Sequence, residues 1–185
     1  MSLLLFQSDF QNIADVAIHC DQRKLNQAIR EAQDYDLEEL FCDFWNVIVT
    51  NWDNEAYKTL IDGGVYEGCK GNRSFAGVKK ILALYTYSRY IIINNFNDTP
   101  NGNVSKNNDF SIPKTIKELE FMADKYRSMG YKEYEKATAY LCKNKDSFAD
   151  FEGYDCKSCG CNGICGSKTS VKGYGISGSI ITKEI

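Results

Sequence analysis

The 185-residue chain contains one histidine, His19, and two prolines. Nucleophilic catalysis through a Ser–His or Cys–His pair would have to use His19, and the neighbouring Cys20 points away from it in any regular element. A histidine at the surface or at a helix end is the simpler interpretation. Because proline interrupts helices, its scarcity allows long helical segments.

A phosphate-binding loop is also lacking. Gly63-Gly64 and the glycines at 68 and 71 have neither the spacing nor the lysine–serine ending of a P-loop. The carboxylates fall on predicted solvated helix faces, and nothing in their pattern selects a catalytic pair. We therefore predict that the protein is not an enzyme.

The charge and hydropathy of the chain exclude further classes. A net charge of -3 argues against a protein that grips nucleic acid through its phosphates, although such a chain can line a passage for DNA. No apolar run approaches the roughly 20 residues that span a bilayer. The segment Met1–Phe6 is too short for a secretory signal and lacks its basic flank. We expect an intracellular origin and no membrane association.

Aromatic residues are plentiful, with 12 Tyr and 10 Phe but only 2 Trp. A tyrosine has a large apolar body and a polar tip, which suits interfaces as well as cores. The hydrophobic share of 43% is sufficient for a genuine core.

Long stretches of 3.6-residue periodicity predict a mainly α fold. We expect a helix bundle with a small hairpin or extended loop and an extended C-terminal tail. Helices are predicted at about 22–33, from residue 36 along an apolar stripe that reaches residue 48, and at 54–61, 74–94, 115–130 and 131–143. A short first helix is predicted near 8–11.

Capping signals mark the ends of these helices. Asp21, Asp36 and Thr115 have the spacing of N-caps, and Glu118 completes a capping box with Thr115. Gly63-Gly64 is expected to end the helix at 54–61. Gly130 is expected to separate two antiparallel helices.

Two segments are predicted to be extended or turned. Residues 66–72 look like a loop or a short extended piece, and residues 104–112 are the expected returning arm of a hairpin. The Pro and Asn-Gly pair favours a tight tip. That tip consists of Thr99, Pro100, Asn101 and Gly102.

The composition changes at about residue 148, where glycines become frequent and helical periodicity ends. We therefore divide the chain into a helical body, 1–147, and a Cys/Gly-rich tail, 148–185. Such a tail stays disordered or becomes ordered against a partner.

Four cysteines crowd into ten residues of this tail with the spacing C-x2-C-x-C-x3-C: Cys156, Cys159, Cys161 and Cys165. Zinc takes four thiolates in a tetrahedron, and glycines let a short loop wrap around an ion. Structural zinc sites more often use two separated pairs, so three of these thiols with one from the body, or a set of free or oxidised thiols, remain alternatives. Cys20, Cys42, Cys69 and Cys142 are scattered among apolar residues, where a free thiol behaves as a small hydrophobe.

The stretch 63–111 resembles a known family. The matching residues are Gly-Gly-Val-Tyr at 63–66, Phe-Ala-Gly-Val-Lys-Lys at 75–80, Tyr-Thr-Tyr-Ser-Arg-Tyr at 85–90, and Thr-Pro-Asn-Gly-Asn-Val at 99–104, followed by Lys106 and Ser111. This pattern is similar to the small neck proteins of Bacteroides phages and prophages, crAss-like phages among them. The helix order over about the first 145 residues resembles the head-to-tail connector, or adaptor, proteins of tailed phages.

The resemblance implies a structural protein of the virion, made in the cytoplasm of the bacterial host. It implies a ring, commonly of twelve copies, that joins the portal to further neck or tail proteins and lines the channel through which genomic DNA passes. A ring subunit needs apolar or aromatic surface on two sides, which the many tyrosines would supply.

The end of the tail is the candidate contact with the portal. Adaptors carry a C-terminal extension, and here its apolar residues would add a strand to a portal edge. These residues are Ile176, Ile180, Ile181 and Ile185. The hairpin tip at 99–102 is the second candidate contact.

One alternative function comes from a different class. The cysteine cluster would also suit a cytosolic zinc-knuckle protein that regulates a partner or binds nucleic acid.

Overall fold

Helices make up most of the described chain, so the predicted mainly α fold is confirmed. The computed structural model describes residues 2–11, 13, 20–68, 71–100, 102–105 and 114–151, and only the backbone at 98, 99 and 102–105. The α-helices are α1 (Gln22–Glu31), α2 (Glu38–Phe41), α3 (Phe44–Thr50), α4 (Lys58–Asp62), α5 (Gly77–Asn95) and α6 (Ile116–Lys143). The antiparallel hairpins are β1 (Gly64–Gly68) with β2 (Gly71–Phe75), and β3 (Phe96–Thr99) with β4 (Gly102–Ser105). Two short 3-10 turns span Gln7–Phe10 and Glu55–Tyr57.

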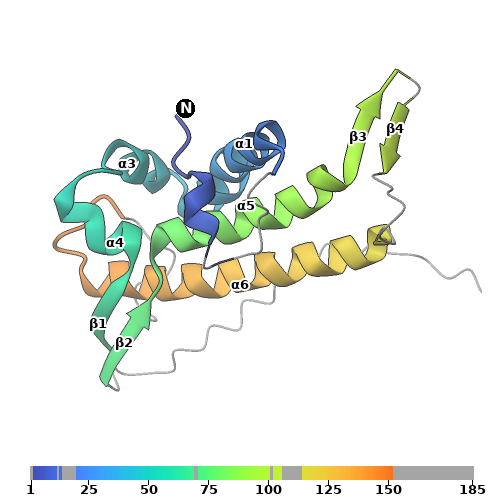
Figure 1. Cartoon of the computed structure of the whole chain (residues 1–185). Coiled ribbons are helices and arrows are strands. Elements are labelled where there is room, and N and C mark those ends of the chain that lie inside the picture. Colours follow the sequence, from blue (N-terminus) through green and yellow to red (C-terminus); the bar gives the residue numbers. More distant parts are fainter. Residues whose placement is uncertain are drawn as a thin grey trace, which may run out of the picture.

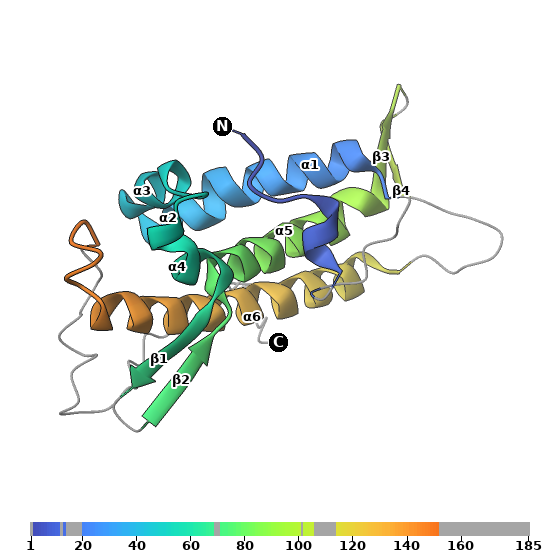
Figure 2. The ribbon, with the colours of Figure 1, turned by 60° about the vertical axis from the view of Figure 1, so that its left-hand side comes forward.

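Helix α5 is the centre of the bundle. It lies between α1 on one side and α6 on the other (Figures 1 and 2). Residues 81–88 are all buried, although a helix at a protein surface would bury only one stripe. The apolar and aromatic residues around α5 therefore serve two partners.

Helix α6 contradicts the predicted break at Gly130. It runs without interruption through Ile116–Lys143, and Gly130 lies buried within it. A Cβ atom at this position would come within 2.7 Å of the ring of Tyr85 on α5. The glycine thus permits the close approach of α5 and α6 and does not end a helix.

The prediction that a helix starts at Asp36 is also wrong. Asp21 caps α1 as expected, through a hydrogen bond from the Lys24 backbone N–H to its Oδ1 (3.2 Å). Helix α1 then continues through a π-helical segment, Ala32–Leu37, into α2, so that 22–41 is one helical run. It ends at Cys42, whose φ of 50° turns the chain. Asp36 lies inside the run, where its carboxylate binds Arg89 instead of a helix N-terminus.

Residue 33 of this run holds the N-terminal segment in place. The side chain of Gln33 is fully buried; it accepts a hydrogen bond from the Leu4 backbone N–H and donates one to the Ser2 carbonyl, both at 3.0 Å. These two hydrogen bonds pair with the backbone of the N-terminal segment as a neighbouring strand would, and they keep Leu5 in the core.

Two glycines with positive φ close the base of the first hairpin. Gly63 (φ 92°) ends α4, as predicted, and Gly77 (φ 80°) begins α5. A Cβ on Gly77 would lie 2.4 Å from the Gly63 nitrogen, so the two backbones cross too closely for side chains. Residues 71–75 form β2, and α5 consequently begins three residues later than predicted.

The packed body extends past residue 147, where we placed the boundary of the tail. Phe148 and Phe151 are 3% and 4% exposed, and their rings contact Phe44. Phe148 also packs against Tyr140 on α6. The predicted tail beyond residue 151 lies outside the described residues.

The Gly130 contact predicts an unusual response to alanine. Gly130→Ala should lower the free energy of unfolding by about 1–2 kcal/mol, because the clash with Tyr85 outweighs the helix propensity gained. Ser128→Ala, at an exposed position of the same helix, should be neutral or slightly stabilising. Urea unfolding measures both, and a stabilised Gly130→Ala would contradict the close approach.

Buried tyrosines predict a loss of stability in alkali. Burial raises the pKa of Tyr85 and Tyr134 above its usual value and that of Tyr90 to about 12. Because the folded state holds these protons more tightly, their contribution to stability is complete below about pH 10 and is lost as pH rises toward 12. Urea unfolding between pH 8 and 11.5 should show this decline, and Tyr90→Phe should reduce its slope. A flat profile would contradict the burial of these hydroxyls.

Candidate interaction surfaces

The two hairpins project from opposite ends of α5. The first precedes α5 and points past α6, and the second follows α5 and points the other way (Figure 1). A two-stranded sheet on its own is only marginally stable in water and leaves unpaired backbone groups along its edges. Both arms are therefore suited to contact with other chains.

Aromatic stacking attaches the first hairpin to the body. Tyr66 of β1 and Phe75 at the end of β2 both contact the ring of Tyr140 on α6, with centroid distances of 5.9 and 4.5 Å. Val65, on the opposite face of β1, is 64% exposed. The hairpin thus has one face packed on α6 and one face in solvent.

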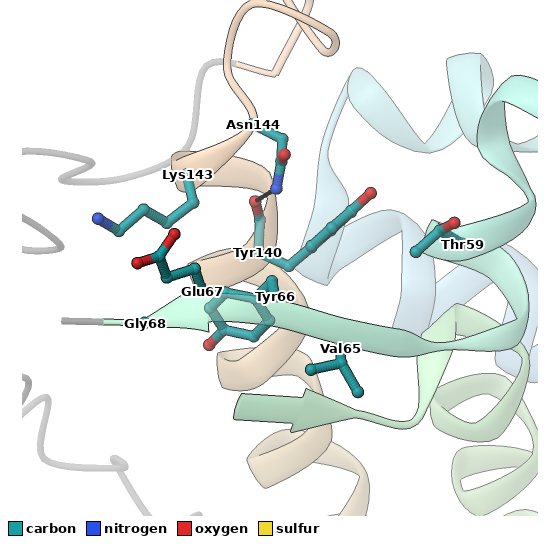
Figure 3. Close-up of a pocket in the computed structure, with 8 residues that line it drawn as sticks. All are labelled: Thr59, Val65, Tyr66, Glu67, Gly68, Tyr140, Lys143 and Asn144. Atoms are coloured by element: carbon teal, nitrogen blue, oxygen red, sulfur yellow. Dashed lines mark hydrogen bonds between the residues drawn. The ribbon is translucent and has the colours of Figure 1, made fainter. Parts of the chain in front are cut away.

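A groove of about 680 Å³ lies between β1, α4 and the end of α6. Figure 3 shows Tyr66 and Tyr140 in it, with Glu67 and Lys143 gathered at one end. At the same end of α6, the Asn144 side-chain amide donates a hydrogen bond to the Tyr140 carbonyl (2.8 Å). The remaining lining residues are Thr59, Val65 and Gly68.

The second hairpin has the predicted tip. Thr99 pairs with Gly102 at the end of the ladder, and Pro100 lies in the turn between them, whereas Asn101 is outside the described residues. The returning strand β4 covers only Gly102–Ser105 of the 104–112 arm that we expected, and 106–113 lies outside the described residues.

A buried lysine anchors the base of this hairpin. Lys24 of α1 is 7% exposed, and its ammonium donates hydrogen bonds to the Phe96 carbonyl and to Asn97 Oδ1 (2.9 Å). A cation at the C-terminal end of a helix is favourable, because the last carbonyls carry partial negative charge. Lys24 therefore joins α1 to the point where α5 becomes β3.

An ion-pair cluster joins the helical run to α5. Arg89 donates to both oxygens of Asp36 (2.6 and 3.0 Å) and to Glu31 (3.3 Å). In an α-helix, residues five apart point about 140° away from each other. The π-helical segment turns Glu31 and Asp36 toward the same guanidinium, and the hydrogen bonds to Asp36 raise the pKa of Arg89.

Sequence reasoning missed this cluster. Arg89 falls on the apolar stripe of its helix, and a charged residue in that position signals a paired side chain. The partner was not identifiable, because Asp36 had the spacing of a helix cap.

Most of the predicted chemical sites lie outside the described residues. These are His19, Cys69, the four tail cysteines Cys156, Cys159, Cys161 and Cys165, and the tail isoleucines Ile176, Ile180, Ile181 and Ile185. Among the described residues, Cys20, Cys42 and Cys142 form no disulfide. The described residues contain no group of three or more metal-ligating side chains. Within the same residues, no helix has both the length and the apolar character to cross a bilayer.

The fold defines the class of this protein as a mainly α bundle with two hairpin arms. Residues 39–162 match the family described as "Family of unknown function (DUF6712)", and the chain belongs to that family. The matched range contains both hairpins, α5, α6 and three of the four tail cysteines. No curated protein and no solved structure matches the chain.

The ion-pair cluster predicts a specific loss of stability. Asp36→Ala removes two of the three hydrogen bonds of a guanidinium that is 22% exposed, and should lower the free energy of unfolding by about 2 kcal/mol. Asp34→Ala, two residues away and exposed, should change it by less than about 0.5 kcal/mol. Urea unfolding of both variants tests the difference, and equal effects would contradict the assigned pairing.

Proposed function

We propose that this chain is a structural subunit of the neck of a tailed phage, where it forms a ring between the portal and the tail. Its role is mechanical: the ring bridges its neighbours, retains packaged DNA and leaves an axial passage. Catalysis by this chain is not part of the proposal.

The observation that carries the proposal is the unit of hairpin, α5 and hairpin. Of the residues that resemble phage neck proteins, those that the structure describes fall on Gly63 and β1, on the end of β2, on the start and middle of α5, and on the second hairpin. A subunit that bridges two neighbouring rings needs contacts at two opposite ends. The two arms, which leave α5 in opposite directions, meet that requirement (Figures 1 and 2).

The anchoring of both arms supports the same role. Tyr140 stacks on the base of the first arm, and Lys24 binds the base of the second. Rigid attachment lowers the entropy lost when an arm binds a partner. The exposed Val65 and the adjacent groove give the first arm a surface for an extended segment of a neighbouring chain.

Electron microscopy of the full chain, alone and mixed with the portal protein from the same genome, tests the proposal. We expect closed rings with an axial channel, commonly of twelve subunits, seated on the narrow end of the portal. The symmetry follows directly from the class averages.

A matched variant separates ring formation from metal binding. Replacing Cys156, Cys159, Cys161 and Cys165 with serine should leave the rings intact if these thiols are peripheral. A chain that stays monomeric and does not bind the portal would refute the connector role. Zinc-dependent binding of nucleic acid by such a monomer would instead support the zinc-knuckle alternative.

A further inference from the structure

Helix α6 presents a stripe of lysines and large apolar residues on the side away from α5. Its members follow one another at intervals of three or four residues, which places them on one helix face. We call this stripe the α6 outer face; it consists of Lys117, Phe121, Lys125, Met129 and Lys132.

This face has no partner within the described chain. Phe121 and Met129 are 74% and 41% exposed, whereas the opposite side of α6 is buried against α5. None of the three lysines forms an ion pair with another described residue. Phe121 thus stands in solvent, with Lys117 and Lys125 and also the acids Glu118 and Asp124 about one helical turn away.

A surface of opposite charge lies on the helical run 22–41. We call it the acidic end; it consists of Asp34, Tyr35, Glu38 and Glu39, all exposed. Its three carboxylates also form no ion pair within the described chain. Tyr35 is 64% exposed, and Arg89 lies 5.6 Å from the centroid of its ring, so an ordered aromatic side chain stands among the acids.

The α6 outer face and the acidic end are complementary in charge. The α6 outer face contains three lysines and the acidic end three carboxylates, each with an exposed aromatic residue among its members. They do not pair with each other inside the described chain, although the end of the helical run does reach α6, where the Tyr134 hydroxyl donates a hydrogen bond to the Leu40 carbonyl (2.7 Å). A contact between two different surfaces of identical subunits is heterologous, and repeated contacts of this kind close into a ring.

We propose that the α6 outer face of one copy docks on the acidic end of the next, with Phe121 and Tyr35 at the centre of the contact. The occupant of the lysine stripe is thus a second copy of this chain. This inference rests on the proposed ring and identifies its lateral interface; the hairpins serve the contacts with other rings.

Charge reversal with rescue tests the interface. Lys125→Glu with Lys132→Glu reverses the α6 outer face, and Glu38→Lys with Glu39→Lys reverses the acidic end. Each pair of changes should abolish rings and weaken self-association by at least about tenfold, because like charges then meet. Sedimentation velocity and electron microscopy of the full chain measure both effects.

Rescue distinguishes a direct contact from a general loss of folding. An equimolar mixture of the two reversed variants should form rings again, because each reversed surface then meets its complement on the other variant. Arg23→Glu and Asp53→Lys, which change exposed charges outside both surfaces, should leave the rings intact. Raising the salt from 0.1 to 1 M should dissociate wild-type rings, since the screening length falls from about 10 to about 3 Å.

The outcomes separate this inference from the proposed function. Rings that survive both reversals would overturn the interface while leaving the connector role intact. Reversed variants that lose rings but are not rescued on mixing would also overturn it. A wild-type chain that forms no ring, even with the portal, would refute the proposed function itself.

Discussion

The close packing of α5 on α6 is the contact on which the other features of this molecule depend. Gly130 lets the ring of Tyr85 lie directly against the backbone of α6, and no residue with a Cβ atom fits there without a shift. With that contact in place, α6 continues as one helix of 28 residues instead of two short ones. One side of α5 is thereby covered along its length, and the other side is left for the helical run 22–41.

This arrangement decides which surfaces face outward. Other helices pack on both sides of α5, and one hairpin begins at each of its ends (Figure 1). On the other side of α5, the π-helical segment directs Glu31 and Asp36 to the half-buried guanidinium of Arg89. The irregular helix thus brings two carboxylates to one charged partner.

The same layering gives a ring subunit what it requires. In the ring that we propose, the outer sides of α6 and of the helical run would be the two faces that lateral contacts need. The hairpins would be the projections that contacts along the ring axis need at its two ends. The family to which the chain belongs has no known function, so these roles are proposals. They share one physical basis, because the central helix α5 positions both the lateral faces and the hairpins.

The sequence by itself determined the local structure. The mainly α content, the caps at Asp21 and Thr115, the end of α4 at Gly63 and the turn around Pro100 all follow from interactions within a few residues of the chain. Two inferences failed because a local signal had a distant cause. Gly130 resembled a helix end because a glycine required by Tyr85, 45 positions away, looks the same as a glycine required by a turn. Asp36 resembled a cap because its partner, Arg89, lies 53 positions along the chain. Only the tertiary structure decided these roles, since close approach and charge pairing depend on which residues meet in space.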